Sequence, residues 1–492
     1  MPLYSFSNIP PSGLRVLDFF TAFLYERGDG GKGVRITLRT SSGLKDFIES
    51  LRENGELLTL SNSLSPKFEI STILSELGKK EAPALLFEKV KGYSFPVVGN
   101  LLGTKKRLSM ALRVDQDHLF EDLLRKIDRR FSPKPVSGPV SKESITKKGR
   151  IDLLKHLPVL THYSKDSGPY ITSGITSARD PESGVIARGL HRMEVRGKNQ
   201  LGISLLNPPL SDIYAKYKRE NRRMEVATVI GVDPLILISF ILKVPPGTDK
   251  LSVAGGLMGQ AVPISKARTV DIDIPARAEV VIEGYIDPRG KEEDGTLGEG
   301  SGYYMAFSKS PTVHVTALTC QKGAIYQAIV PWSLEVDNLL CLVHGLDFVP
   351  KMKREIPSLK RIHFIPGTFG SHVVMSIETD HKGEIRRALS LALSFTHIKK
   401  AVIVDEDVNP EDDQEVEWAL ATRFQGDRDL IVLPDLRGQP IDPSSKEGFL
   451  TTKIGMDATR PKKEGFEKVD VPMEVKQRLA PILGKLTRKE KK

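Results

Sequence analysis

The sequence predicts an α/β chain of several domains (α+β in its overall class), in which two α/β domains flank a central β-barrel. The chain has 492 residues, of which 39% are hydrophobic and 27% charged, so it can bury more than one core. Towards both ends, apolar residues at helical spacing alternate with short apolar runs that are typical of buried strands. The middle of the chain instead carries short β-like runs separated by turns.

The first α/β domain is predicted over residues 37–130. Apolar residues recur at helical spacing over 44–51 and again over 70–77, and each run is followed by a glycine, so both are expected to be amphipathic helices. The apolar runs 84–87 and 95–98 are expected to be buried strands. Helices and strands that follow one another in this way are typical of a small α/β unit.

The segment before this domain, residues 1–36, has little regular pattern, and we expect an extension or a start assigned too far upstream. Its longest apolar run, 19–25, is too short to span a bilayer, and it follows neither a basic leader nor a small-residue cleavage site. The sequence therefore predicts neither a signal peptide nor a membrane anchor.

The barrel is predicted over residues 151–325, after a linker over 131–150 that is rich in Pro, Ser and Lys. A glycine-rich loop, 294–304, falls between its last two strands, so side chains on this loop are expected at one mouth of the barrel. The expected strands are 171–178, 185–195, 201–206, 235–240, 278–285 and 312–319.

The last α/β domain is predicted over residues 330–470, with a parallel sheet. Residues 471–492 are expected to form a basic tail, which is most simply a solvated helix end. The expected strands of the domain are 362–365, 373–377, 401–404 and 430–433, and its expected helices are 383–395 and 414–424.

Charge and cysteine content restrict the function classes. The net charge is +10, but lysines and arginines are spread along the chain and do not gather beside aromatic residues, so we expect no nucleic-acid binding. Anionic small molecules are more natural partners for such a surface. Cys320 and Cys341 are too few for a disulfide framework or a cysteine-based zinc site, which is typical of a reducing interior or of a thermophile that avoids labile residues. We therefore expect a cytoplasmic protein.

Two carboxylates, Asp294 and Glu299, stand five residues apart in a glycine-rich stretch that neither a packed helix nor a packed strand favours. Upstream of them, Arg192 lies on a predicted strand of the same barrel. One guanidinium and two carboxyls could thus meet across the barrel, and this trio suits a small carboxylic acid substrate. The alternative is a surface arginine paired with Glu194 or Glu182, beside a solvated acidic loop.

Six sequence blocks, taken together and in this order, resemble the UbiD family of decarboxylases, and the resemblance runs from about residue 40 to 465. They are LHRMEV (190–195), VIEGYIDP (281–288), LGEGSGYY (297–304), EWALATR (417–423), DRD (427–429) and KIGMDAT (453–459). The resemblance implies an N-terminal α/β domain, a central split β-barrel that binds a flavin, and a C-terminal α/β domain. It also implies assembly as a homodimer or a homohexamer.

The activity that this resemblance implies is a reversible, non-oxidative decarboxylation with prenylated FMN, which a separate flavin prenyltransferase supplies. The cofactor is the electron sink that the carbanion left by departing CO2 requires. Arg192 is then expected to orient the substrate carboxylate, and Glu299 to protonate the carbon. Asp294 is expected to pair with Arg192. The family usually has Glu at position 294, so this chain has a shorter arm there.

The resemblance also implies a flavin site and a metal site. In the family a divalent metal, Mn or Mg, holds the flavin phosphate, but its ligand positions here are Ala187, Leu210 and Lys250, none of which is a metal ligand. We hypothesise that protonated Lys250 neutralises the phosphate directly. Asp249 and Asn207 lie one and three residues before two of these positions and leave a partial metal site open. The residues expected at the flavin are Leu190, His191, Arg192, Ser204, Leu205, Leu206 and Lys250.

The substrate rests on analogy with archaeal members of the family, which include the decarboxylase that converts trans-anhydromevalonate 5-phosphate into isopentenyl phosphate. A phosphorylated substrate needs cations near the barrel mouth, and the candidates are Lys309, Arg361, His372 and Lys382. The alternatives are a hydroxybenzoate-type decarboxylase of quinone synthesis and a catalytically silent flavin-binding subunit, which the lost metal ligands would suit.

Overall fold

The computed structural model describes residues 43–80, 82–116, 119–136, 145–148, 151–245, 247–290, 294–306, 310–379, 381–461, 466 and 468–489. The expectations for residues 1–36 lie outside this part of the chain. Two units can be distinguished, one made of the two chain ends and one, Ile36–Arg460, that holds every described element except helix α12 (Met473–Lys489). No helix in the described part of the chain is both long and apolar enough to cross a membrane.

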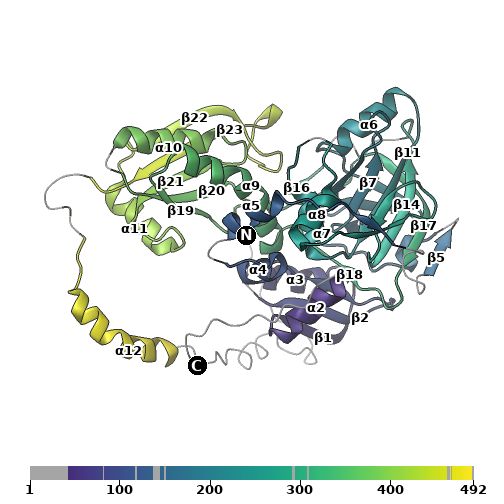
Figure 1. Cartoon of the computed structure of the whole chain (residues 1–492), viewed down its shortest axis with the longest axis horizontal. Helices are drawn as coiled ribbons and strands as arrows, with labels where there is room; N and C mark the ends of the chain where they lie inside the picture. Colours follow the sequence, from purple (N-terminus) through teal and green to yellow (C-terminus); the bar gives the residue numbers. More distant parts are fainter. Residues whose placement is uncertain are drawn as a thin grey trace, which may run out of the picture. The chain divides into compact units, whose positions relative to one another are not determined.

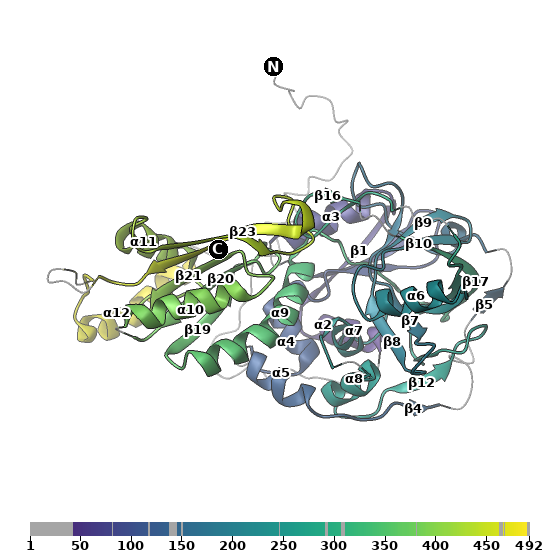
Figure 2. The same cartoon turned by 90° about the horizontal axis from the view of Figure 1, so that it is seen from above.

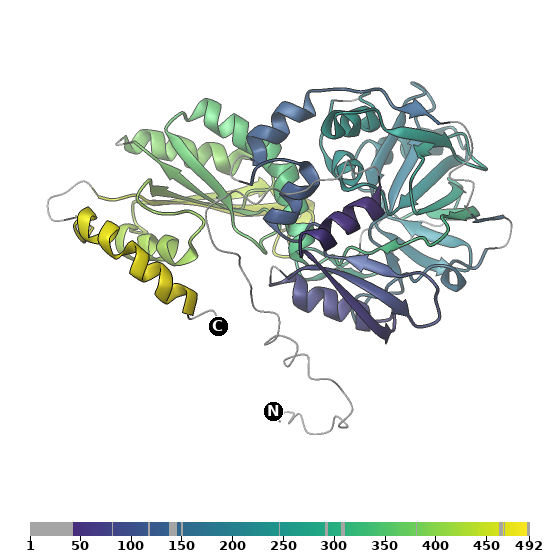
Figure 3. The same ribbon diagram turned by 60° about the horizontal axis from the view of Figure 1, so that its bottom comes forward.

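The N-terminal sheet has the order β1-β2-β3-β18, and two helices cover its opposite faces (Figure 3). On one face Phe47 of α2 shares an apolar cluster with Leu86, whereas on the other Leu74 of α3 packs with Leu85. This alternation along β2 is the strand periodicity. The elements are α2 (Leu44–Glu53), β1 (Leu57–Leu64), α3 (Glu69–Gly78), β2 (Ala84–Val90), β3 (Val97–Gly99), α4 (Lys105–Leu112), α5 (Leu119–Ile127) and β18 (Tyr326–Gln327).

The two helices and two strands that the sequence predicts in this region are confirmed. The pairing of β18 with β3 was not predicted, because a two-residue strand leaves no periodic pattern. It returns the chain to the N-terminal sheet directly after the barrel.

The central sheet curls through the order β6-β9-β10-β17-β14-β11-β7-β8, with β5 also paired to β17 (Figure 1). It is antiparallel at every pairing. Its strands are β5 (Ile145–Lys148), β6 (Tyr170–Ile171), β7 (Ile175–Arg179), β8 (Ile186–Leu190), β9 (Met193–Gly197), β10 (Gln200–Ile203), β11 (Met224–Ile230), β14 (Val280–Ile286) and β17 (Thr312–Cys320). The predicted β-barrel class is therefore confirmed.

Among the described residues, two small sheets and the α-helices α6, α7 and α8 complete the barrel region. β4 pairs in parallel with β12, and β5 pairs antiparallel with β17 of the central sheet, so the segment predicted as a linker contributes two strands. The elements are β4 (Lys134–Pro135), α6 (Leu210–Arg219), α7 (Pro234–Ile241), α8 (Lys250–Met258), β12 (Pro263–Lys266), β13 (Asp273–Pro275), β15 (Leu297–Gly298) and β16 (Tyr304–Met305).

The predicted strand over 235–240 is wrong, because this run is helix α7. The Asp233 carboxylate caps it by accepting from the N–H of Leu235 at 2.8 Å, and Pro234 occupies the first turn. Almost all of its residues are buried, so the run shows no helical period, and a short buried helix then looks like a buried strand.

The predicted strand over 185–195 is also wrong, since it is two strands. β8 pairs with β7, whereas β9 pairs with β6 and β10, and the chain leaves the ladder at His191 and Arg192 between them. Arg192, which was expected on a strand of the barrel, therefore lies in the break between two strands.

The C-terminal sheet has the order β19-β20-β21-β23-β22, and its two faces are covered by different helices (Figure 2). Apolar residues of α9 and α10 pack with Val373 and Met375, whereas those of α11 pack with Val374. The three inner strands are parallel, as predicted, and the two edge strands are antiparallel. The elements are α9 (Leu334–Glu355), β19 (Leu359–Phe364), β20 (His372–Ile377), α10 (Lys382–Ser394), β21 (Lys400–Asp405), α11 (Asp413–Arg423), β22 (Leu430–Arg437) and β23 (Leu450–Ala458).

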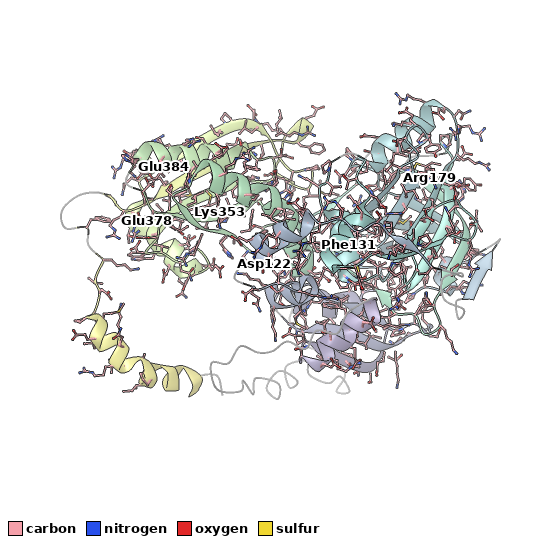
Figure 4. The ribbon with its side chains drawn as sticks, in the orientation of Figure 1. Asp122, Phe131, Arg179, Lys353, Glu378 and Glu384 are labelled. Carbon is pink, nitrogen blue, oxygen red and sulfur yellow. The ribbon has the colours of Figure 1, made fainter. Side chains whose placement is uncertain are left out.

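Figure 4 labels two basic side chains, Arg179 and Lys353, each of which is paired with an acid. Arg179 on the barrel lies 3.2 Å from Asp271, and Lys353 on α9 lies 2.7 Å from Glu121. Ion pairs of this kind place positive and negative side chains next to one another on the surface.

Candidate active site

Arg192 binds both predicted carboxylates at once. Its Nη1 donates to Oε1 of Glu299 and its Nη2 donates to Oδ2 of Asp294. The side chain of Arg192 is 10% exposed, that of Asp294 3% and that of Glu299 17%, so the trio is largely shielded from water. A guanidinium between two carboxylates is held in one orientation, because each of two edges of its plane is bonded.

The alternative partners of Arg192 are paired elsewhere. Glu194 accepts from Arg196 at 2.9 Å, and Glu182 lies 2.7 Å from Lys216. The interpretation of Arg192 as a surface strand arginine is therefore wrong.

The break between β8 and β9 explains how Arg192 reaches the loop. The N–H of His191 donates to the carbonyl of Gly174 at 3.1 Å, and the carbonyl of Arg192 accepts from the N–H of Ser204 at 3.1 Å. Nδ1 of His191 lies 2.8 Å from the Ser204 carbonyl, so this nitrogen carries the proton. Burial lowers the pKa of His191 to about 4, which leaves the ring neutral. These bonds hold the backbone on both sides of Arg192.

The glycine-rich loop that carries the carboxylates is a compact hairpin built on β15 and β16. The N–H of Glu299 donates to the carbonyl of Tyr303 at 2.9 Å, and Gly302, with φ of +81°, donates to the carbonyl of Glu299 at 2.9 Å. Glycine is favoured at this dihedral. A Cβ on Gly295 would lie 2.1 Å from Oγ of Ser167, so the loop also approaches a neighbouring segment too closely for a side chain.

That neighbouring segment, residues 162–167, fixes the loop and was missed by the sequence analysis. Oδ1 of Asp166 accepts from the N–H of Gly298 at 3.0 Å, and the N–H of Ser167 donates to the carbonyl of Thr296 at 2.9 Å. The other oxygen, Oδ2 of Asp166, accepts from the N–H groups of His162 and Tyr163 at 3.0 and 2.8 Å. Its only signal in the sequence is an acidic residue in a short polar run before a predicted strand.

The environment of Glu299 favours its protonated form. Burial raises the pKa of Glu299, the Arg192 charge lowers it, and the Asp294 charge raises it, with a net rise. A carboxyl whose pKa is raised keeps its proton to a higher pH than usual and is better suited to donate it to a reacting atom. The arrangement is thus suited to binding a carboxylate at Arg192 and delivering a proton from Glu299.

The three positions expected to replace metal ligands do not form a metal site. Ala187 and Leu210 belong to one buried apolar cluster, and Nζ of Lys250 donates to the carbonyl of Phe240 at 2.6 Å. Burial lowers the pKa of Lys250 to about 8. Within the described residues there is no group of three or more His, Cys, Asp or Glu side chains that could hold a metal ion. Asp249 instead caps α8 by accepting from Leu251 at 3.0 Å.

Of the residues expected at a flavin, Leu190 and His191 precede Arg192 in the sequence, and Ser204, Leu205 and Leu206 follow it. Ser204 is bonded to the Arg192 carbonyl, and Leu205 and Leu206 follow it. Leu206 is 40% exposed, and Leu190 is half-buried. Leu205 is buried, so Leu190 and Leu206 are the leucines of this set that offer exposed apolar surface to a planar ring system.

A cavity of about 280 Å³ opens beside Glu299. Besides Glu299, its wall is formed by one face of α3, the 162–163 segment, the loop that follows Glu299, and Trp332. The lining residues are Ser71, Thr72, Ser75, Glu76, Lys79, His162, Tyr163, Gly298, Glu299, Gly302, Tyr303, Tyr304 and Trp332.

The cations predicted to bind a phosphorylated substrate are not part of this lining. Arg361 donates to Asn409 at 2.9 Å, Lys382 lies 2.7 Å from Asp457, and His372 begins strand β20, all within the C-terminal domain. Lys309 lies outside the described residues. The lining instead contains Lys79, which the sequence analysis did not select.

Family comparisons agree with the three-part architecture. The N-terminal, Rift-related and C-terminal domains of 3-octaprenyl-4-hydroxybenzoate carboxy-lyase match residues 48–127, 134–334 and 337–458. The chain belongs to the UbiD family. It is therefore a carboxy-lyase by family, an enzyme class that acts on carboxylic acids.

Two archaeal relatives of this UbiD-family chain are named anhydromevalonate phosphate decarboxylase. The one from Methanosarcina mazei is 33% identical over 438 residues, which cover 87% of this chain and 99% of the relative. The one from Methanothermobacter thermautotrophicus is 29% identical and covers 87% and 99%. Among solved structures, the UbiD-class enzyme HmfF from Pelotomaculum thermopropionicum in complex with FMN has a TM-score of 0.83 and 36% identity, and the match covers 89% of this chain and 99% of that one.

Proposed function

We propose that this chain is a prenylated-FMN-dependent decarboxylase that converts trans-anhydromevalonate 5-phosphate into isopentenyl phosphate. The observation that carries the proposal is the Arg192 guanidinium bonded at once to Asp294 and Glu299. The family supports the reaction type, and the names of the two archaeal relatives support the substrate. HmfF, the structural neighbour, has been solved both with FMN and with prenylated FMN, which supports the cofactor.

When bound, the prenylated flavin would supply the electron sink for the electron pair of the broken carbon–carboxylate bond. Arg192 would bind the substrate carboxylate by charge-assisted hydrogen bonds and align it for loss of CO2. Asp294 would keep the guanidinium in that orientation when Glu299 releases it. Glu299 would then give its proton to the carbon that CO2 has left, and solvent would return a proton to Glu299. Overall, the substrate carboxylate would leave as CO2, and the proton from Glu299 would form the new C–H bond.

The flavin phosphate would be neutralised by Lys250 in place of a metal. Ala187 and Leu210 offer no donor, whereas an ammonium is a compact charge suited to phosphate. The apoprotein pKa of about 8 leaves Lys250 mostly protonated at neutral pH. Leu190, Leu205 and Leu206 would flank the ring system.

The partners follow from the same proposal. A flavin prenyltransferase would supply the cofactor, and the enzyme would work in the cytoplasm as a homodimer or homohexamer. The two cysteines, Cys320 and Cys341, are not joined in a disulfide, which agrees with a reducing compartment. One of the solved relatives is a dimeric form, which supports an oligomer.

The test is the reaction itself with protein co-expressed with a flavin prenyltransferase. We expect trans-anhydromevalonate 5-phosphate to yield isopentenyl phosphate and CO2, and Glu299→Gln to bind the flavin but form no product. Turnover of 4-hydroxybenzoate alone would favour the aromatic acid alternative. A folded, flavin-loaded protein that decarboxylates neither acid would favour the silent-subunit alternative.

A further inference from the structure

We propose that the cavity beside Glu299 holds the end of the substrate that is remote from the reacting carboxylate, and that Lys79 binds an anionic group there. The group is a phosphate or a second carboxylate. This inference rests on the proposed function, because it takes Glu299 as the residue that meets the reacting carbon.

Glu299 connects the cavity to the chemistry. It bonds Arg192 and also lines the cavity, so a ligand whose carboxylate lies at Arg192 has the cavity available to the rest of its body. Tyr163 packs against Gly298, where a Cβ would lie 2.4 Å from its ring, and its hydroxyl accepts from the Trp332 N–H at 3.1 Å. The wall near Glu299 is therefore well fixed.

The wall formed by α3 is polar. Thr72, Ser75, Glu76 and Lys79 follow the i, i+3, i+4, i+7 spacing of a single helix face, and all four line the cavity. The opposite face of the helix, which includes Leu74, packs into the apolar core. A face of two hydroxyls, a carboxylate and an ammonium offers hydrogen bonds to a polar ligand group, whereas an unsubstituted aromatic ring would leave these groups unpaired.

Lys79 is placed to meet an anion. Its Nζ lies 4.4 Å from the centre of the Trp332 ring and 3.2 Å from the Glu76 carboxylate. The contact with the ring restricts the ammonium without using its hydrogen-bond donors. Glu76 is 64% exposed, and exposed ion pairs contribute little to stability, so a ligand anion can replace it.

The size of the cavity indicates a small acid. A volume of about 280 Å³ lies just below the range for small-molecule sites, which is roughly 300 to 1,000 Å³. A five- or six-carbon acid with one phosphate suits this volume, whereas an aromatic acid that bears a polyprenyl chain does not. The cavity thus favours a small, doubly anionic substrate.

The test compares holoenzymes of the wild type, Lys79→Ala and Lys79→Arg on trans-anhydromevalonate 5-phosphate and on the same acid without its phosphate. We expect Lys79→Ala to raise KM for the phosphorylated acid roughly ten- to a hundredfold, as loss of a charge-assisted bond does, with kcat changed little. Lys79→Arg should recover most of that loss. KM for the unphosphorylated acid should not change in either variant.

Lys91→Ala is the matched control, because Lys91 is an exposed lysine of the same domain paired with Glu69 and outside the cavity lining. We expect wild-type kinetics from it. An equal effect of Lys79→Ala on both acids, or no effect on either, would overturn the inference.

Calorimetry separates this inference from the proposed function. If the wild-type holoenzyme decarboxylates neither acid, the proposed function fails, but the Kd of the phosphorylated acid can still be compared between wild type and Lys79→Ala. A Kd at least about tenfold weaker in the variant supports the anion site. Equal Kd values contradict it.

Discussion

The carboxylate of Asp166 accepts a hydrogen bond from the N–H of Gly298 at 3.0 Å, one residue before Glu299. Its second oxygen accepts from the N–H groups of His162 and Tyr163, so one buried side chain joins two segments 132 positions apart. Burial raises the pKa of Asp166, and the three N–H groups act against this rise. The position of Glu299 thus depends on Asp166, although none of these hydrogen bonds joins Asp166 to Arg192.

Asp166→Asn should impair catalysis while the protein stays folded. The asparagine amide would point a donor at one of the backbone N–H groups, so the strand before Glu299 would shift. We expect kcat to fall roughly ten- to a hundredfold, because small misplacements of reacting groups have effects of that size, with little change in KM. Steady-state kinetics of the flavin-loaded variant and its circular dichroism spectrum measure this. Asp435→Asn, at an exposed position, is the control, and equal kinetics in the two variants would remove Asp166 from the account.

Asp294→Asn should move the pH dependence of the rate in a defined direction. The Asp294 charge raises the pKa of Glu299, so its removal lowers that pKa. Because Glu299 must be protonated to donate, activity is present below its pKa and lost above it. The alkaline limb of the kcat profile should therefore move to lower pH in the variant, with a plateau reduced by roughly tenfold, equivalent to about 1.4 kcal/mol. A limb that stays in place or moves to higher pH would contradict the role given to Glu299.

Flavin binding should depend on Lys250 and not on a metal. We expect Lys250→Met to weaken flavin binding by roughly ten- to a hundredfold, since a charge-assisted bond to phosphate is lost. The affinity of the wild-type apoprotein for the flavin should fall as the pH rises through about 8, where the free lysine loses its proton. Lys266→Ala, at an exposed lysine of the barrel region, should leave the affinity unchanged. Stoichiometric Mn or Mg that EDTA removes together with the flavin would refute the lysine hypothesis.

Glu335 should make stability depend on pH. It lies at the start of α9, is fully buried, and accepts from the N–H groups of Asn100 and Leu102 at 3.0 Å each. Burial raises its pKa to about 7 from 4.5. The stabilisation of the protonated form is then fully present below about pH 4.5 and is lost as the pH rises through about 7. It amounts to roughly 3 kcal/mol at most, from 1.36 kcal/mol per pKa unit.

Urea unfolding of the wild type and of Glu335→Gln over this pH range tests the point. As the pH rises, the free energy of unfolding of the wild type should fall relative to that of the variant, whatever the absolute stability of the variant. Parallel curves would show that Glu335 does not titrate in this range.

The elements and site residues that were predicted correctly are those marked in the sequence by a hydrophobic period or a family motif. The two predicted helices of the N-terminal domain are confirmed, because each has one apolar face, and the inner strands of the C-terminal sheet are confirmed, because they are short runs with apolar residues on both faces. The meeting of Arg192 with Asp294 and Glu299 was expected from the glycine-rich loop and the family blocks, and the structure brings the three together. Their catalytic roles remain proposals.

The parts that were missed lack such a signal. Helix α7 is apolar all round, so its run shows no helical period. Asp166 acts through backbone N–H groups of segments far apart in the chain, and no pattern of side chains records that. Lys79 lies on the polar face of an amphipathic helix, which sequence alone cannot distinguish from a solvated face. Tertiary contacts decide each of these cases.

The most direct test of the central claim is a mass spectrum of the product formed in D2O. Protein co-expressed with a flavin prenyltransferase should carry stoichiometric prenylated FMN and convert trans-anhydromevalonate 5-phosphate into isopentenyl phosphate with one deuterium on the carbon that lost CO2. Glu299→Gln should bind the same flavin and release no labelled product. A folded protein without flavin, or labelled product formed at the wild-type rate by the Glu299→Gln variant, would contradict the account.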